Sequence, residues 1–313
     1  MQGQVYKSTG SWFLVKVGGE FYNCKIKGKI RLKGLKSTNP VAVGDFVDIE
    51  IENKGDETIG LINKIRPRKN YILRRSVKLS KQVQIIAANI DQVFLMVTLN
   101  NPPTSTTFID RFLIAAEAYD INVILLFNKL DAYDVDEFAE MKFLADTYRE
   151  IGYTCVGTSV INERNIDQVK DLMKDKISLF AGHSGVGKSS LINLIAPGLD
   201  LSVNAISDQH IQGKHTTTFA EMFDIDFGAQ IIDSPGIKGF GLVDFENQEI
   251  ADYFPEFRAY QQDCKFNNCL HDQEPKCAVK EAVEADKIPY FRYESYLKIL
   301  RSEEDNYRKD IHH

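Results

Sequence analysis

The segment 177–194 combines the residue types and the spacing of a phosphate-binding loop. An apolar run predicts a strand over Ile177–Ala181, and Ser190–Leu194 predicts the start of a helix. Between them lies GHSGVGKSS, formed by Gly182, His183, Ser184, Gly185, Val186, Gly187, Lys188, Ser189 and Ser190. The pattern G-x4-GKS between a strand and a helix is typical of loops that hold nucleotide phosphates.

Each part of this loop has a separate chemical task. Glycines let consecutive backbone N–H groups point at phosphate oxygens, and the N-terminus of the following helix adds its dipole. Lys188 would supply positive charge to the β- and γ-phosphates, and the Ser189 hydroxyl would ligate Mg²⁺. The sequence therefore predicts a site for a nucleoside triphosphate and its magnesium ion.

The tetrad formed by Asn128, Lys129, Leu130 and Asp131 follows an apolar run that predicts a buried strand over 121–127. The Asp131 carboxylate can accept from the ring N1–H and from the exocyclic amine of guanine, a pair of donors that adenine lacks. The amide of Asn128 and the stem of Lys129 would complete the base pocket. This tetrad predicts a preference for guanine nucleotides.

A short loop with Thr158 and Ser159 follows the strand predicted over 153–156. GTPases keep a loop of small residues at this place, and its backbone closes over the base. The pair here matches the usual Ser-Ala sequence poorly, but we include Thr158 and Ser159 among the expected nucleotide contacts.

Two further segments are typical of the nucleotide-sensing switches of GTPases. The first, GKHTTT at 213–218, lies in a stretch without periodicity, and a threonine hydroxyl there would reach Mg²⁺ and the γ-phosphate. We expect Thr217 to act in catalysis and Thr218 to contact the nucleotide, while the sequence leaves open which threonine of 216–218 binds the ion. In the second, Asp233 would hold Mg²⁺ through water and the Gly236 N–H would sense the γ-phosphate.

The order of these motifs is unusual. Strands expected at 91–98, 121–127, 153–156 and 177–181 alternate with helices expected at 108–119 and 166–173, which predicts a mostly parallel α/β sheet. In ordinary GTPases the phosphate loop precedes the Asn-Lys-x-Asp tetrad, whereas here the tetrad comes first. The sequence therefore predicts a circularly permuted GTPase, whose second switch leads directly into the C-terminal region.

The N-terminal segment is expected to form a small β-barrel. Strands are predicted over 5–17, 21–30, 43–51 and 60–65, without helical periodicity, which favours an OB-type barrel. Such barrels often bind single-stranded nucleic acid on a basic face with aromatic side chains. The candidates for that face are Trp12, Phe13, Tyr22, Lys25, Lys27 and Lys29. The sequence does not decide which aromatic side chains stack on bases and which fill the barrel.

Charge is divided unevenly along the 313 residues, whose formal net charge is −6. Residues 1–80 hold 16 Lys+Arg and 7 Asp+Glu, whereas residues 81–313 hold 22 and 37. A basic N-terminal module on an acidic body favours a polyanionic partner that meets one end of the molecule.

No apolar run approaches the ~20 residues of a membrane span, and no signal segment precedes the first strand, so we expect a cytoplasmic protein.

Four potential metal ligands gather near the C-terminus in the pattern C-x4-C-x-H-x5-C. Three thiols and one imidazole in a closed set favour a structural Zn²⁺ ion over a catalytic one. The surrounding stretch is polar and short, so metal binding would supply much of its folding free energy. The expected ligands are Cys264, Cys269, His271 and Cys277.

Beyond them, a helix beginning near Tyr290 carries Arg292, Lys298 and Arg301, which either touch RNA phosphates or form a solvated face.

With these motifs together, the chain resembles the ribosome small subunit-dependent GTPase A family, also called RsgA or YjeQ, over essentially its whole length. The resemblance implies an OB-fold RNA-binding domain at 1–70, a circularly permuted GTPase domain at 71–238 and a zinc-binding domain at 239–313. It also implies a monomer that hydrolyses GTP to GDP, stimulated by the small ribosomal subunit, in late maturation of that subunit. The barrel and the zinc module would contact its 16S rRNA.

The group that orients the attacking water is not given by the usual motif. Many GTPases place a glutamine after the Asp-x-x-Gly switch, but Ile237 stands there and cannot form a hydrogen bond. We expect His215 to orient the water, as a base or as a hydrogen-bonding group, with Lys188 and Thr217 neutralising charge. Two alternatives remain: a GTP-gated RNA-binding scaffold with little hydrolysis, and an ATPase with a coincidental tetrad.

Overall fold

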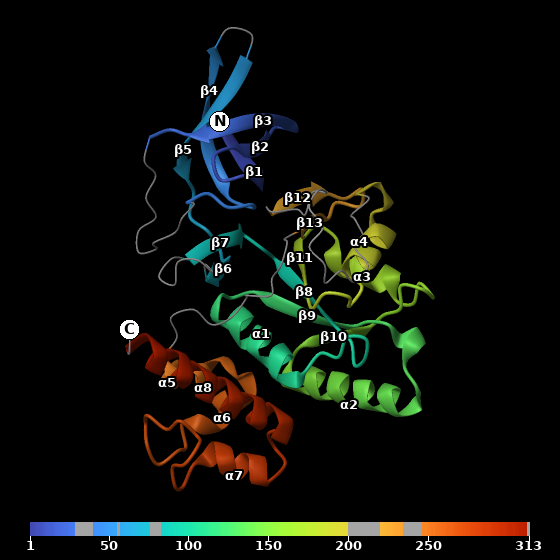
Figure 1. Cartoon of the computed structure of the whole chain (residues 1–313), viewed down its shortest axis with the longest axis vertical. Coiled ribbons are helices and arrows are strands. Elements are labelled where there is room, and N and C mark those ends of the chain that lie inside the picture. Colours follow the sequence, from blue (N-terminus) through green and yellow to red (C-terminus); the bar gives the residue numbers. More distant parts are fainter. Residues whose placement is uncertain (29–39, 55–56, 76–82, 200–219, 234–245, 312–313) are drawn as a thin grey trace.

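The computed structural model describes residues 1–28, 40–54, 57–75, 83–199, 220–233 and 246–311. Figure 1 shows three parts along the long axis of the molecule, with the N-terminal barrel and the C-terminal helices at opposite ends of a central α/β domain. Within the described residues, no helix is long and apolar enough to cross a membrane.

The N-terminal part is a closed five-stranded barrel. Its strands run in the order β1-β2-β3-β5-β4, and a β1–β4 pairing closes the ring. Because side chains alternate along each strand, Val5, Phe13, Val15, Cys24 and Ile62 point inward and are fully buried or nearly so. The predicted OB-type barrel is confirmed. Its strands are β1 (Gln2–Ser8), β2 (Phe13–Val17), β3 (Glu20–Ile26), β4 (Phe46–Lys54) and β5 (Glu57–Ile65).

The single strand predicted over 5–17 is wrong, because the chain reverses at Gly10, whose φ of +87° lies in the left-handed region. The Thr9 N–H donates to the Trp12 carbonyl at 2.9 Å and closes this turn between β1 and β2. The strand predicted over 21–30 ends at Ile26, and Lys29 lies outside the described residues.

The central domain has a sheet in the order β10-β9-β8-β11-β13-β12, in which all pairs but β12–β13 are parallel. Its strands are β8 (Gln92–Val97), β9 (Asn122–Phe127), β10 (Thr154–Gly157), β11 (Ile177–Ala181), β12 (Glu221–Asp224) and β13 (Gln230–Asp233). Its helices are α1 (Thr106–Ala118), α2 (Val135–Ile151), α3 (Ile166–Met173) and α4 (Lys188–Ile195). A hairpin of β6 (Tyr71–Arg75) and β7 (Val83–Ala88) connects the barrel to this domain.

Helices cover both faces of this sheet, so its central strands are buried on both sides. In β8, Val93 and Leu95 pack with α1 and α2, while Phe94 and Met96 pack with α3 and α4. The predicted helix Ile166–Met173 and strand Ile177–Ala181 are confirmed with the same bounds. Helix α2 was not predicted, although Asp134 and Glu137 form a capping box at its start.

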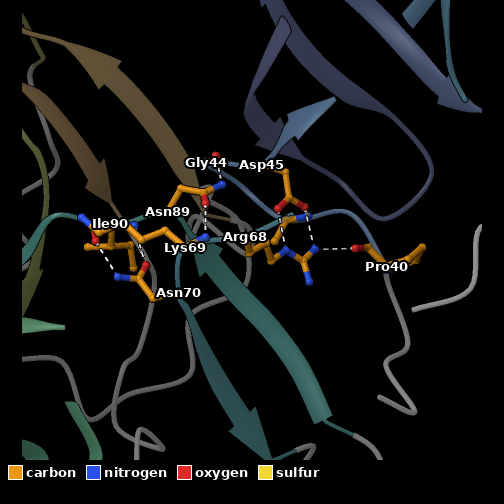
Figure 2. Close-up of polar contacts among 9 residues, drawn as sticks. Pro40, Gly44, Asp45, Arg68, Lys69, Asn70, Asn89 and Ile90 are labelled. Atoms are coloured by element: carbon orange, nitrogen blue, oxygen red, sulfur yellow. Dashed lines mark hydrogen bonds and ion pairs between the residues drawn. The ribbon is translucent and has the colours of Figure 1, made fainter. Parts of the chain in front are cut away.

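A buried polar joint connects the barrel to the central domain (Figure 2). Arg68 donates from Nε and Nη2 to the two carboxylate oxygens of Asp45, at 2.6 and 2.7 Å. Asn89 Nδ2 donates to the Gly44 carbonyl at 2.9 Å, while its Oδ1 accepts from the Lys69 N–H at 2.8 Å. Since Asp45 and Asn89 are buried, these contacts fix the barrel at this place.

Two backbone features strengthen the joint. Asn70 and Ile90 exchange two hydrogen bonds, each of 2.8 Å, between the Asn70 side chain and the Ile90 backbone. Gly44 has a φ of +88°, and a Cβ atom there would lie 2.0 Å from the Ala88 carbonyl oxygen. Only glycine permits this approach of the barrel to β7.

The C-terminal part consists of α5 (Asn247–Ile250), α6 (Pro255–Gln261), α7 (Ala278–Glu284) and α8 (Tyr290–Ile311). Helix α8 packs on α1, and the Arg292 side chain is fully buried between them. Arg292 donates to Asp110 at 2.6 Å and to Glu256 at 2.6 Å, and the Tyr148 hydroxyl also donates to Asp110 at 2.6 Å. For Arg292, both alternatives from the sequence, contact with RNA phosphates and a solvated face, are therefore wrong.

Arg292→Ala should destabilise the protein by about 3–5 kcal/mol, because Asp110 and Glu256 would keep buried negative charges without a positive partner. The matched control is Lys298→Ala on the same helix, whose exposed pair with Glu294 (3.1 Å) should contribute less than about 1 kcal/mol. Urea unfolding followed by far-UV circular dichroism measures both. Equal losses in the two variants would contradict the role of Arg292.

Candidate functional site

Four sequence motifs come together at one edge of the central sheet. The 128–131 tetrad follows β9, the Thr158 loop follows β10, the phosphate loop follows β11, and Asp233 ends β13. These strands are parallel, so their carboxyl ends share one edge, which is where ligands bind in open α/β sheets. The circular order of the motifs therefore leaves their spatial arrangement intact.

The phosphate loop curls between β11 and α4 as its glycines require. Gly187 has a φ of +101°, and a Cβ atom there would lie 2.5 Å from Asn128 Nδ2. The Lys188 ammonium folds back over the loop and donates to the carbonyls of Gly182 and His183 at 2.8 and 2.6 Å. The His183 ring packs on Phe108 of α1, with 4.0 Å between the ring centroids.

Asn128 connects the three loops of the site. Its Nδ2 donates to the Val186 carbonyl in the phosphate loop at 2.8 Å. Its Oδ1 accepts from the Thr158 hydroxyl at 3.0 Å, and both side chains are buried. Asn128 is predicted from the sequence to lie in the base pocket, and in the structure its amide also holds the phosphate loop and the Thr158 loop together.

Asp131 lies exposed at the rim of the same edge, where Ser159 fixes its orientation. The Ser159 hydroxyl donates to Asp131 Oδ1 and accepts from the Asn162 N–H at 3.1 Å. The Leu130 N–H donates to the Thr158 carbonyl at 3.1 Å, so the two loops are also joined through their backbones. The loop that matched the usual sequence poorly thus supports the predicted guanine-binding carboxylate.

Lys129 adopts a left-handed conformation, with a φ of +66°, and its ammonium donates to the Asn101 carbonyl at 2.6 Å. This contact stretches the lysine stem across the site, toward the loop that follows β8. An αL residue at this position turns the chain sharply, which brings Asp131 back over the sheet edge.

Tyr133 is a supporting residue that the sequence analysis missed. Its hydroxyl donates to the Asn128 carbonyl at 2.8 Å and accepts from the Leu99 N–H at 3.0 Å. Burial raises the pKa of Tyr133 to about 12, so it keeps its proton. Its place just after the tetrad was visible in the sequence, but its partner Leu99 lies on another strand end and no local pattern indicates that contact.

Some expected residues lie outside the described part of the chain. They are His215, Thr217, Thr218 and Gly236. Asp233 is described as the last residue of β13, opposite Glu221 of β12.

The four predicted metal ligands come together beside α8. The ligand atoms of Cys264, Cys269, His271 and Cys277 all lie within 4.8 Å of one another. Cys264 Sγ lies 3.8 Å from Cys277 Sγ and 3.6 Å from His271 Nδ1, and His271 Nδ1 lies 3.3 Å from Cys277 Sγ. A tetrahedral ion with metal–sulfur bonds of ~2.3 Å and a metal–nitrogen bond of ~2.0 Å needs edges of about 3.5–3.8 Å. The donor set therefore fits a four-coordinate metal ion.

Burial is the largest cause that raises the pKa of Cys277 to about 12. Burial also raises the pKa of Cys269. A bound divalent cation would favour the thiolate form of these groups, and the four residues together could hold one. Helix α8 fixes the loop from outside, because Tyr293 and Tyr296 donate to the carbonyls of His271 and Leu270, each at 2.7 Å.

The outer face of the β2–β3 hairpin carries two aromatic–lysine pairs. Lys25 Nζ lies 4.1 Å from the ring of Trp12, and Lys16 Nζ lies 5.7 Å from the ring of Phe21. Trp12 is 38% exposed and Phe21 is 51% exposed. Of the candidates from the sequence, Phe13 is buried in the barrel and Trp12 belongs to this outer face, which we call the barrel face.

The sequence matches two family models. Residues 65–243 match the model described as RsgA GTPase, and residues 2–59 match the RsgA N-terminal domain. Together they cover most of the barrel and all the strands and helices of the central domain.

Relatives resemble the chain over nearly its full length. A protein of Christiangramia forsetii, named small ribosomal subunit biogenesis GTPase RsgA, is 62% identical, and the match covers 99% of each chain. A protein of Flavobacterium psychrophilum with the same name is 58% identical, over 100% of this chain and 96% of the relative.

Two solved structures have the same architecture. The crystal structure of YjeQ from Thermotoga maritima has a TM-score of 0.78 at 37% identity, covering 96% of this chain and 97% of that one. The structure of YloQ, described as a circularly permuted GTPase, has a TM-score of 0.72 at 29% identity, covering 97% and 95%. The permuted order of motifs, the barrel and the matches agree: the chain belongs to the RsgA GTPase family.

Proposed function

We propose that this protein hydrolyses GTP to GDP and phosphate, as a hydrolase of the acid-anhydride class, in the biogenesis of the small ribosomal subunit. The observation that carries the proposal is the hydrogen bond from Asn128 to Val186. It holds the predicted guanine-binding loop against the predicted phosphate loop, so one nucleotide can occupy both. The names of the full-length relatives support the biological role.

The phosphate loop would hold the nucleotide through its backbone N–H groups, from Gly182 to Ser190. Lys188 would exchange its two carbonyl contacts for phosphate oxygens, and Ser189 would ligate Mg²⁺. Asp233 fits the role of a magnesium ligand through water, because it ends the strand next to the phosphate-loop strand. Asp131 would accept from guanine, with Ser159 fixing its orientation.

Hydrolysis further needs an oriented water and neutralised charge on the γ-phosphate. We assign the water to His215 and the neutralisation to Lys188, Thr217 and Mg²⁺, with Thr218 and Gly236 as further nucleotide contacts. The assignments in 213–218 and at Gly236 rest on the sequence motifs alone.

The metal cluster would hold one structural Zn²⁺ ion. Thiolate and imidazole donors in a closed tetrahedral set favour zinc among the common divalent ions. The ion would fold the loop between α6 and α7 against α8, and the module would present this end of the molecule to ribosomal RNA.

The barrel face gives the second contact with RNA. Stacking of bases on Trp12 and Phe21, with Lys16 and Lys25 near the phosphates, is the usual chemistry of single-stranded binding. We propose 16S rRNA of the small subunit as the partner, a cytoplasmic location where that subunit is assembled, and a monomer as the working form.

The test is phosphate release from GTP and from ATP by the full chain, with and without purified small ribosomal subunits. The expected result is GTP-selective turnover that rises at least ~100-fold with subunits, a barrier change of about 2.7 kcal/mol. Guanine-selective binding without stimulated release would support the gated-scaffold alternative. Equal use of ATP would overturn the assignment of Asp131.

Asp131→Asn should weaken GTP binding by at least ~100-fold, because an amide cannot accept both guanine donors and places its own N–H₂ group against one of them. The same variant should gain affinity for xanthosine triphosphate, which has a carbonyl acceptor where guanine has an amine. Fluorescent-nucleotide titration measures both affinities. Unchanged GTP affinity would show that Asp131 does not contact the base.

Tyr133→Phe should weaken GTP binding by about 3- to 10-fold, because the buried Asn128 carbonyl and Leu99 N–H both lose a partner. The matched control is Tyr290→Phe, because Tyr290 is 70% exposed. Fluorescent-nucleotide titration measures the GTP affinity of both variants. Equal affinities in the two variants would mean that Tyr133 does not support the base loop.

Cys277→Ser should remove the zinc that we expect at about one ion per chain, and should lower the thermal stability of the C-terminal helices. The control is Cys24→Ser, which changes a buried thiol of the barrel core and should leave the zinc content unchanged. Elemental analysis of the purified proteins gives the metal content. Equal zinc in all three proteins would contradict the assigned ligand set.

A further inference from the structure

Among the residues that the structure describes, the barrel contacts the central domain at two places of different character. The first is the buried joint of Figure 2, built from Arg68, Asp45, Asn70 and Asn89 and attached to the start of β8. The second, which we call the seam, is the antiparallel pairing of β1 with β12, in which Lys7 lies opposite Glu221. The pairing makes the barrel and the central domain one continuous sheet of eleven strands.

The seam is centred on the carboxylate of Asp224, at the end of β12. Asp224 accepts from the Tyr6 hydroxyl at 2.7 Å, from Lys16 Nζ at 2.5 Å and from Gln230 Nε2 at 3.0 Å. Burial would raise the pKa of Asp224, but these hydrogen bonds outweigh it and hold the pKa below its ordinary value. One side chain of the hairpin β12–β13 therefore holds two residues of the barrel.

The seam lies directly beside the barrel face. The β1–β2 register shifts between Val5 and Lys7, and this β-bulge at Tyr6 re-aims its side chain. The Tyr6 ring packs edge-on against Phe21, with 5.2 Å between centroids, and the Lys16 ammonium lies over both rings. An RNA phosphate at the Phe21 end of the barrel face would thus meet the ammonium group that Asp224 holds.

The other side of the seam leads to the nucleotide site. Strand β12 follows the segment that contains His215, Thr217 and Thr218, and β13 ends at Asp233, the first residue of the second switch motif. The described hairpin, 220–233, therefore connects the two predicted switches along the chain. A shift of this hairpin relative to β11 would move Ala220 and Asp233, the two residues at which the hairpin joins the predicted switch segments.

The two contacts differ in how easily they yield. The contacts of the joint that reach the start of β8, from Asn89 to Gly44 and between Asn70 and Ile90, are buried, and breaking them would leave polar groups without water or a partner. The Lys16 and Asp224 side chains of the seam are 29% and 42% exposed, so water replaces their contact at little cost. The joint therefore keeps its contacts when the barrel is displaced, and the displacement changes the contacts at the seam.

We propose that Asp224 is a positioning residue for subunit-stimulated hydrolysis, which transmits RNA binding on the barrel face through the seam to the β12–β13 hairpin. This inference rests on the proposed function. It requires Asp224 to change the turnover of the bound complex rather than the affinity for the subunit. Lys25 lies at the other end of the barrel face, away from the seam. It should change the affinity for the subunit and leave the turnover of the bound complex unchanged.

The experiment measures kcat and KM for purified small subunits in GTP hydrolysis by the full chain. Asp224→Asn should lower the stimulated kcat on the order of 5- to 30-fold and leave KM for subunits and subunit-free turnover unchanged. Lys25→Met, the matched control, should raise KM for subunits and leave the stimulated kcat unchanged. Asp224→Glu should restore part of the lost kcat, because it keeps the carboxylate for Lys16.

Tyr6→Phe provides a second variant that removes only the hydroxyl at the seam, and it should lower kcat in the same direction. Thermal melts of each protein identify a variant that does not fold. A wild-type protein without stimulation would overturn the proposed function itself. Normal stimulation in the wild type, together with wild-type kcat in folded Asp224→Asn and Tyr6→Phe, would overturn this inference alone, as would a rise in KM with unchanged kcat.

Discussion

The hydrogen bond from the Asn128 amide to the Val186 carbonyl is the contact on which the nucleotide site depends. It crosses between two loops that the circular order separates in the chain but that the parallel sheet brings to one edge. The glycine at position 187 is needed because this amide lies 2.5 Å from where a Cβ atom would stand. Base recognition and phosphate binding thus share one buried polar group, and the Tyr133 hydroxyl fixes the same residue through its backbone carbonyl.

Much of the fold and of the site could be predicted from the sequence, because the strongest patterns are local. The strand–loop–helix at 177–194 and the alternation of the barrel strands are each contained in a short segment, and the four metal ligands lie close together in the chain. Turn geometry was harder. The reversal at Gly10 lies inside an otherwise alternating segment, so one strand was expected where two form.

The remaining errors concern contacts between residues far apart in the chain. Arg292 lies on a helix of mixed charge, and only its distant partners Asp110 and Glu256 reveal that it is buried. Helix α2 is a different case, because its signal is local. Few of its residues are buried, so its apolar pattern is weak, and the capping box was the better indication of a helix. Tyr133 and the polar joint at Arg68 likewise depend on partners that no local pattern contains. Polar groups buried at interfaces between domains are therefore the hardest features to predict from the sequence.

The continuous sheet has a consequence for how the chain folds during its own synthesis. The barrel closes through the β1–β4 pairing, so it can fold as soon as its own strands have been made. The outer edge of β1 has a different fate, because Lys7 and its partner Glu221 are 214 residues apart. For most of translation that edge presents unpaired backbone groups, and the charged Lys7 protects it against pairing with other chains. One of the last strand pairings available to the nascent protein therefore joins its first strand to β12.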